Sequence, residues 1–105
     1  MPTAAAEELL AAVREVLVNV RKHCPPGTGV WLLLEAEDDG YRLSVRDDGP
    51  GIPEGRLARA AEAGHRGVAD SIRGRIAGLG GTADLHTGTD GTEWEFTVPL
   101  TVESR

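Results

Sequence analysis

A double proline at positions 25 and 26 sets the firmest limit on how this chain can fold. Proline cannot continue a helix and biases the residue before it away from helix, so a helix that begins near the N-terminus has to end by Cys24. Residues 5–23 carry apolar side chains at helical spacing, and we therefore predict an amphipathic helix there. Its apolar stripe consists of Leu9, Leu10, Val13, Val16, Leu17 and Val20.

Beyond the prolines the apolar pattern changes from the spacing of a helix to that of strands. Residues 29–37 contain an unbroken apolar run at 30–34, which predicts a strand that is buried on both faces or lies near the centre of a sheet. Residues 38–40 read Asp-Asp-Gly and predict a hairpin turn. The alternation of apolar and polar side chains over 41–46 then predicts a second strand with one face in water.

The second half of the chain repeats this alternation of helices and strands. We predict a short helix at 54–63, a longer helix from Val68 to the Gly80-Gly81 pair, and strands at 82–87 and 92–100. This order indicates an α/β (α+β) two-layer sandwich, in which a mixed, mainly antiparallel sheet is covered on one face by about three helices. The length of 105 residues fits a single domain.

Charge and composition argue against several classes of protein. Lys and Arg number 11 and Asp and Glu number 17, so the formal net charge is −6, which argues against a protein that binds nucleic acid by neutralising phosphates. The single cysteine, Cys24, excludes an internal disulfide and a multi-cysteine zinc site and suits a reducing compartment. No apolar run approaches the ~20 residues of a membrane span. We therefore expect a cytoplasmic domain without direct membrane contact, either alone or as a piece of a larger membrane protein.

A second stripe on the first helix carries polar side chains. Glu15, Asn19 and Lys22 fall within about 60° of one another, and His23 follows them. An amide oxygen is a good ligand for Mg²⁺, a lysine can contact phosphate, and a glutamate can orient or deprotonate an attacking group. A solvated helix face has the same composition, so the stripe by itself leaves that alternative open.

Three glycine-containing loops follow the strands or precede a helix. Residues 47–51, Asp-Asp-Gly-Pro-Gly, end the second strand, where an aspartate can accept a hydrogen bond from an exocyclic amine and glycines allow close backbone approach. An ordinary Asp-Gly turn, or two carboxylates acting as general acid and base, are the alternatives there. The loop at 64–67 precedes a helix and suits phosphate, whereas Gly91-Thr92 alone indicates only a turn.

Taken in order, these motifs resemble the nucleotide-binding domain of the GHKL superfamily, which has the Bergerat ATP-binding fold. Residues 14–23 resemble the N box, 47–52 the G1 box, 71–81 the helix and turn after the second glycine loop, and 91–99 the closing strand of sensor histidine kinases of the NarL/DesK-like type. The resemblance implies that the domain binds ATP with Mg²⁺ and transfers the γ-phosphoryl group to a histidine.

The resemblance also implies roles for individual residues. Asn19 would ligate Mg²⁺, Glu15 would polarise the incoming histidine or a water molecule, and Asp47 would accept a hydrogen bond from the adenine amino group. The other residues of the implied site would contact phosphate, let the backbone pass the base, or support Asp47. They are Lys22, His23, Gly49, Gly51, Ile52, Arg66, Gly67 and Thr92.

Two departures from the family pattern keep alternatives open. The loop at 64–67 lacks the fuller Gly-x-Gly pattern, which predicts a short lid over ATP. None of His23, His65 and His86 lies in the context of a phosphoacceptor helix, so we expect the acceptor histidine on a dimerisation domain absent from this chain, with a response regulator downstream. The alternatives are an anti-sigma-factor-type serine protein kinase and a degenerate GHKL module that only docks a partner. The segment 71–76 favours the histidine kinase.

Overall fold

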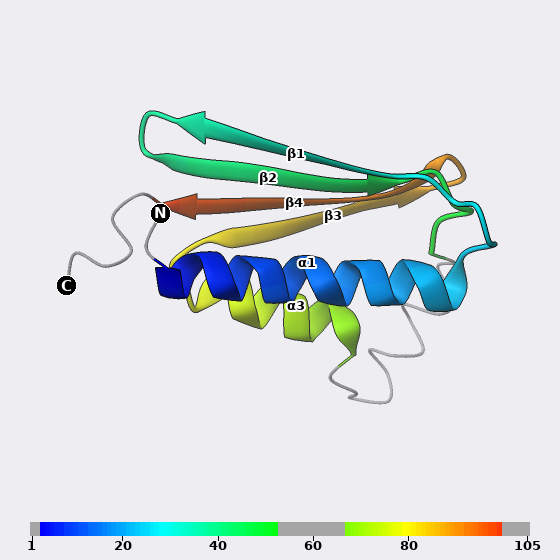
Figure 1. Cartoon of the computed structure of the whole chain (residues 1–105), viewed down its shortest axis with the longest axis horizontal. Coiled ribbons are helices and arrows are strands. Elements are labelled where there is room, and N and C mark those ends of the chain that lie inside the picture. Colours follow the sequence, from blue (N-terminus) through cyan, green and yellow to red (C-terminus); the bar gives the residue numbers. More distant parts are fainter. Residues whose placement is uncertain (1–2, 53–66, 100–105) are drawn as a thin grey trace.

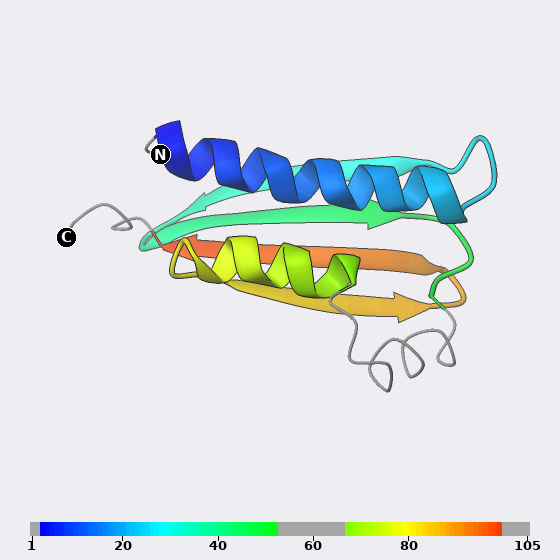
Figure 2. The same ribbon diagram turned by 90° about the horizontal axis from the view of Figure 1, so that it is seen from below.

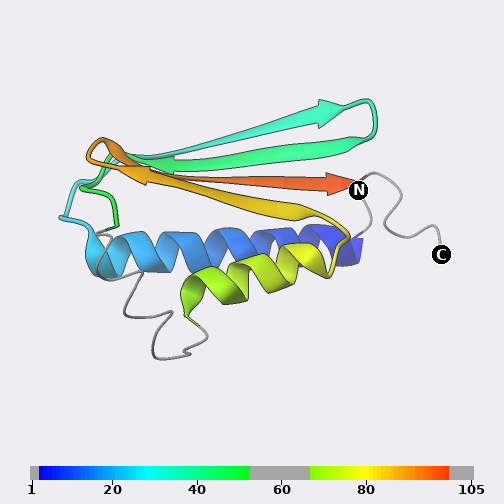
Figure 3. The ribbon, with the colours of Figure 1, turned by 180° about the vertical axis from the view of Figure 1, so that it is seen from behind.

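The computed structural model of the chain describes residues 3–52 and 67–99, which form two layers (Figures 1 and 2). One layer is a four-stranded sheet, and the other consists of two helices on one face of that sheet, as the view from behind also shows (Figure 3). This confirms the predicted two-layer α+β architecture. In chain order the elements are α1 (Thr3–His23), β1 (Val30–Glu37), β2 (Gly40–Asp47), α3 (Val68–Ala77), β3 (Thr82–Gly88) and β4 (Gly91–Pro99).

Two details of the predicted architecture differ from the structure. The strand order is β1-β2-β4-β3 and every pairing in the described ranges is antiparallel, so the sheet is not mixed there. The reason is that β1 with β2 and β3 with β4 are hairpins, and the second hairpin joins the first through β4 in the antiparallel sense. The described ranges contain two helices instead of about three, and the short helix predicted at 54–63 lies outside them.

The long helix α1 buries only part of its predicted apolar stripe. Leu10 and Leu17 are 60% and 39% exposed, because a helix that rests on a sheet covers one face and these two side chains lie on its flank. Cys24 donates its backbone N–H to the Val20 carbonyl at 2.8 Å, and the chain then leaves the helix at the prolines as predicted. Of the two helices described, neither is both long and apolar enough to cross a membrane. The buried residues of α1 are Ala5, Leu9, Ala12, Val13 and Val16.

The strand β1 lies at the edge of the sheet, and the prediction that it is buried is wrong. It pairs with β2 on one side, and the side chains from Trp31 to Leu34 are 51% to 58% exposed. An apolar run permits burial on both faces, but the position of a strand in the sheet decides whether anything covers it. Here α1 packs against β2 and α3 packs against β3 and β4, so β1 extends beyond both helices.

The core lies between the helices and the inner face of β2 and β4. Trp94, Phe96 and Val98 alternate inward along β4, and the rings of Trp94 and Phe96 are 5.9 Å apart. The same alternation continues to the end of the sheet, where the inward positions are Asp47 on β2 and Thr92 on β4. The apolar inner face therefore ends in two buried polar side chains.

Leu43 and Leu33 provide a matched test of this arrangement, because they are 7% and 57% exposed on neighbouring strands. We expect Leu43→Ala to lower the free energy of unfolding by about 2–5 kcal/mol, since it leaves a cavity in the core. Leu33→Ala should lower it by about 0.5 kcal/mol or less. Urea denaturation followed by circular dichroism measures the free energy of unfolding of both variants, and equal losses would contradict the burial of Leu43 and the exposure of Leu33.

Candidate functional site

A pocket opens where the buried polar end of the sheet meets the C-terminal end of α1. Asp47 ends β2 and pairs across the sheet with Thr92 at the start of β4, while Asn19 comes from the end of α1. The lining residues are Val16, Asn19, Val20, His23, Cys24, Asp47, Gly51, Ile52, Thr92 and Trp94. Asn19 and Asp47, on which the predicted ATP site depends, therefore line one pocket.

Asp47 is a buried carboxylate with a defined orientation. It is 5% exposed, and its Oδ1 accepts a hydrogen bond from the Gly49 N–H at 2.8 Å. A carboxylate has about four acceptor positions, so this bond leaves capacity toward the pocket. The neighbouring Asp48 is exposed and accepts a hydrogen bond from the Gly29 N–H at 2.8 Å instead. The two carboxylates thus face different surroundings, which does not favour a paired general acid and base.

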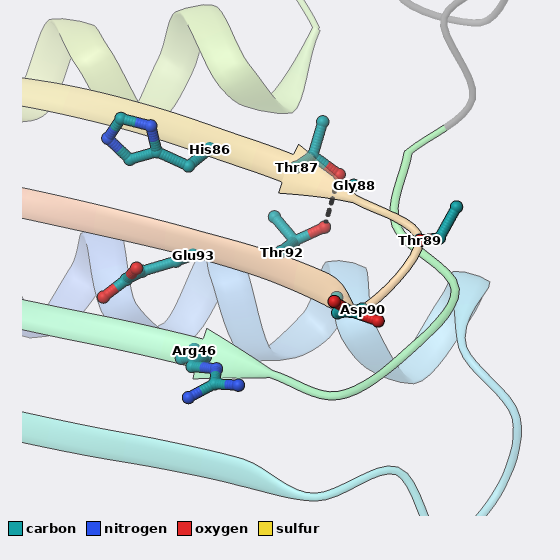
Figure 4. Close-up of a pocket in the computed structure, with 9 residues that line it drawn as sticks. Arg46, His86, Thr87, Gly88, Thr89, Asp90, Thr92 and Glu93 are labelled. Atoms are coloured by element: carbon teal, nitrogen blue, oxygen red, sulfur yellow. Dashed lines mark hydrogen bonds between the residues drawn. The ribbon is translucent and has the colours of Figure 1, made fainter.

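A pair of threonine hydroxyls ties the loop after β2 to the hairpin of β3 and β4. The Ile52 N–H donates to Thr87 Oγ1 at 2.8 Å, and Thr87 Oγ1 lies 2.9 Å from Thr92 Oγ1, a hydrogen bond visible in Figure 4. Because Thr92 lies opposite Asp47 in the register of β2 and β4, this connected unit of loop and hairpin adjoins the end of β2 where Asp47 lies. Thr87 was not predicted as a site residue, and its register opposite Thr92 is the signal that could have identified it.

Two glycines allow this loop to approach its neighbours closely. Gly51 has a φ of +82°, and a Cβ there would clash with the Gly88 carbonyl oxygen. A Cβ on Gly49 would lie 2.7 Å from the Cys24 Sγ and 3.1 Å from Asp47 Oδ1. The close approach predicted for these glycines is therefore made to the hairpin backbone and to the end of α1.

Glu15 and Lys22 line a neighbouring cavity that shares Asn19 with the pocket. Gly67 caps the N-terminus of α3 immediately before Val68, one of the residues of this cavity. Arg66, for which a phosphate contact was predicted, lies outside the described residues. The cavity is lined by Ala11, Arg14, Glu15, Val18, Asn19, Lys22, Val68 and Arg75. Asn19 thus lines both the Asp47 pocket and the cavity of Glu15, which lies one helical turn earlier on α1.

The Glu15 carboxylate is held by α3 and is not simply solvated. Arg75 Nε donates to Glu15 Oε2 at 2.5 Å, and Ser71 Oγ donates to the same oxygen at 3.0 Å. Arg75 also donates to Glu8 Oε1 at 3.1 Å. The hydrogen bond to Glu15, and then that to Glu8, raises the pKa of Arg75. These partners on α3 were missed by the sequence analysis, because no spacing rule links residues this far apart in the chain.

A second pocket lies at the same end of the sheet, on the face away from the helices (Figure 4). Arg46, Glu93 and His86 extend into it from β2, β4 and β3, and Asp90 borders it from the hairpin turn. Among the described residues of the predicted site, Thr92 alone lines this pocket. His86 lies in the strand β3.

The donor chemistry of the pocket suits a cation that arrives with phosphate. No group of three or more His, Cys, Asp or Glu side chains that could hold a metal occurs within residues 3–52 and 67–99. Mg²⁺ does not need such a group, because it commonly combines one or two protein oxygens with substrate phosphates and water. The Asn19 amide in the pocket supplies one oxygen of this kind.

Comparisons with known proteins show similarity both in sequence and in fold. The family described as histidine kinase-, DNA gyrase B-, and HSP90-like ATPase matches residues 4–102. Sensor protein BasS of Escherichia coli (strain K12) is 37% identical over 51 residues, which are 49% of this chain and 14% of that protein. The histidine kinase domain of the Erythrobacter litoralis EL346 blue-light activated histidine kinase has a TM-score of 0.77 and 27% identity over 96% of this chain and 47% of that chain.

A further solved structure, the catalytic domain of histidine kinase ThkA, shares the fold. Its TM-score is 0.73 at 22% identity, over 94% of this chain and 69% of that chain. The chain thus covers most of an isolated catalytic domain but less than half of BasS and of the EL346 kinase domain.

Gly51 and Gly74 provide a matched test of the loop geometry. Gly51→Ala combines a positive φ with a backbone clash, so we expect it to lower the free energy of unfolding by about 1–3 kcal/mol. Gly74 lies inside α3 with open space around it, and Gly74→Ala should raise the free energy of unfolding by about 0.5–1 kcal/mol. Chemical denaturation measures the free energy of unfolding of both variants. A Gly51→Ala variant as stable as the wild type would show that the loop does not pack against the hairpin.

Proposed function

The chain belongs to the family of histidine kinase-, DNA gyrase B- and HSP90-like ATPases, and from this premise we propose that it is the ATP-binding catalytic domain of a two-component sensor histidine kinase. The domain would bind Mg-ATP and transfer the γ-phosphoryl group to a histidine on a separate dimerisation domain. The observation that carries the proposal is that Asp47 and Asn19 line one pocket, which therefore offers a carboxylate suited to the base and an amide suited to a cation held by the phosphates.

Adenine would be recognised by Asp47. Its carboxylate accepts hydrogen bonds only, which suits the exocyclic amino group of adenine and disfavours the carbonyl that guanine has at the same ring position. The apolar side chains of Val16, Val20 and Ile52 in the same pocket suit the flat faces of a base. Thr92 would support Asp47 through the connected unit that it forms with Thr87 and the loop.

The phosphates would lie toward α1 and the start of α3. Asn19 would hold Mg²⁺ through its amide oxygen, and Lys22 and His23 at the end of α1 would contact phosphate oxygens. Gly67, at the N-terminus of α3, would offer backbone close to the phosphates. The bound cation would neutralise charge on the β- and γ-phosphates during transfer.

Glu15 would act on the attacking group. In the transfer, a ring nitrogen of the acceptor histidine forms a bond to the γ-phosphorus while the bond from that phosphorus to the β–γ bridging oxygen breaks, and ADP leaves with the electron pair. The imidazole gains positive charge as the new bond forms. The Glu15 carboxylate would accept a hydrogen bond from the other ring nitrogen and stabilise this charge.

The finer assignment that we propose is a NarL/DesK-like kinase. It rests on the resemblance of residues 14–23 and 71–81 to the corresponding segments of that group. The partners would be a dimerisation and phosphoacceptor domain of the same kinase and a response regulator downstream. We propose no nucleic-acid partner, because the net charge of −6 opposes binding to a phosphate backbone. The domain would work in the cytoplasm, where ATP is available.

Asp47 and Asp48 allow a matched test of adenine recognition, because they are neighbours and only Asp47 lines the pocket. We expect Asp47→Asn to weaken the binding of a fluorescent ATP analogue by about 10- to 100-fold and to narrow the preference for ATP over GTP, since it exchanges a charged acceptor for an amide. Asp48→Asn should bind like the wild type. Titrations with and without Mg²⁺ measure these affinities, and negligible binding by all three proteins would favour a degenerate module.

The transfer reaction itself distinguishes the kinase classes. With Mg-ATP and a separately purified dimerisation and phosphoacceptor domain, we expect acid-labile phosphohistidine on the acceptor. Glu15→Gln should slow its formation by about 100-fold, because the carboxylate assists the attacking imidazole. Acid-stable phosphoserine on a partner protein would instead support the anti-sigma-factor type of kinase.

A further inference from the structure

Two donors from α3 converge on a single oxygen of Glu15. Arg75 Nε and Ser71 Oγ lie 2.5 Å and 3.0 Å from Glu15 Oε2. Ser71 and Arg75 are four residues apart and therefore share one face of α3. Because both donors occupy Oε2, the other carboxylate oxygen keeps its capacity to accept a hydrogen bond from a nucleophile. The contacts from α3 thus orient the Glu15 carboxylate and leave its second oxygen able to accept a hydrogen bond.

The guanidinium that makes this contact is itself fixed at a second point. Arg75 Nη1 donates to Glu8 Oε1 at 3.1 Å, and Glu8 lies two helical turns before Glu15 on the same side of α1. The donors of a guanidinium form a rigid planar fork, so two anchors fix its plane. A glutamate without such a partner samples several rotamers, and ordering it at the moment of reaction costs conformational entropy.

The stabilising effect of this network on the fold is small. The side chains of Glu15 and Arg75 are 24% and 38% exposed, and partly exposed ion pairs of this kind add little to stability. The two helices are held mainly by apolar packing, in which Ile72 and Ile76 of α3 are fully buried. The network therefore determines where the Glu15 carboxylate lies more than it determines whether α3 is folded.

We propose that Arg75, assisted by Ser71, is a positioning residue that holds Glu15 in place for phosphoryl transfer, so that α3 controls the rate of transfer and not the affinity for ATP. This inference rests on the role proposed above for Glu15. It assigns α3 a function in the chemistry, beyond its packing on the sheet. Arg75 lines the cavity of Glu15 and Asn19 and is not among the lining residues of the Asp47 pocket.

The test compares Arg75→Met with a matched control, Arg42→Met. Arg42 is 41% exposed and also pairs with two carboxylates, Glu37 and Glu95, but it lies on β2 away from the site. Transfer to the separately purified phosphoacceptor domain is measured at saturating Mg-ATP, and affinity is measured with the fluorescent ATP analogue. We expect Arg75→Met to slow transfer by about 10- to 100-fold with an ATP affinity within about twofold of the wild type, whereas Arg42→Met changes neither quantity.

Three further variants separate positioning from a structural role. Arg75→Met should cause no additional loss in a Glu15→Gln background, because both substitutions act through one carboxylate. Arg75→Lys keeps one charged donor and should restore part of the rate. Ser71→Ala, which leaves the Arg75 contact intact, should slow transfer less than Arg75→Met and keeps the test open if Arg75→Met fails to fold.

The outcomes distinguish this proposal from the proposed function. If the wild type neither binds ATP nor transfers phosphate, the proposed function fails and the positioning role fails with it. If the wild type does both and Glu15→Gln is slow while Arg75→Met matches the wild type, only the positioning role is wrong. Weaker ATP binding by Arg75→Met, or an additive loss in the double variant, would show that Arg75 contacts the nucleotide or supports the fold, and would likewise overturn the positioning role.

Discussion

The candidate site depends on the register between β2 and β4. In this register Val45 lies opposite Trp94 and Asp47 opposite Thr92, so the inward face changes from apolar to polar within one step of the ladder. Burying a carboxylate is costly unless it is hydrogen-bonded, and the Gly49 N–H supplies such a bond to Asp47. A slip of one residue would turn the Asp47 side chain to the opposite face of the sheet and expose the core residues of β2. The packing that stabilises the fold therefore also delivers the proposed adenine acceptor to its pocket.

The features that follow from neighbouring residues were predictable from the sequence. The end of α1 at the prolines and the hairpin turn at 38–40 follow from short-range patterns, and the structure confirms them. The burial of β1 was predicted wrongly, because an apolar run does not reveal where its strand falls in the sheet order. The partners of Glu15 could not be predicted either. Ser71 and Arg75 lie 56 and 60 residues further along the chain, and only the folded arrangement of α1 beside α3 brings them to the carboxylate.

The two faces of the sheet carry different kinds of side chains. The inner face carries the core and ends in the Asp47 pocket, whereas the outer face carries charged side chains such as Arg42, Arg46 and Glu95. Because the helices cover one face, hydrophobic stabilisation comes from a single layer of packing. The pocket lies at the rim of that layer, where α1 ends and the loop after β2 folds back against the hairpin. A ligand there would contact groups whose positions are already fixed by the fold, which lowers the entropy cost of binding.

The same helix connects binding and chemistry in the proposed kinase. Asn19 and Glu15 are one turn apart on α1, about 6 Å along its axis, but different elements support them. Asn19 lies at the pocket that β2 and β4 complete, whereas the Glu15 carboxylate is oriented by α3. A small shift of α3 would therefore displace the carboxylate from the phosphates and leave the adenine contacts of Asp47 unchanged. This separation would let the domain keep ATP bound before an acceptor histidine arrives, because the Glu15 carboxylate can move away from the phosphates while the nucleotide stays in the pocket.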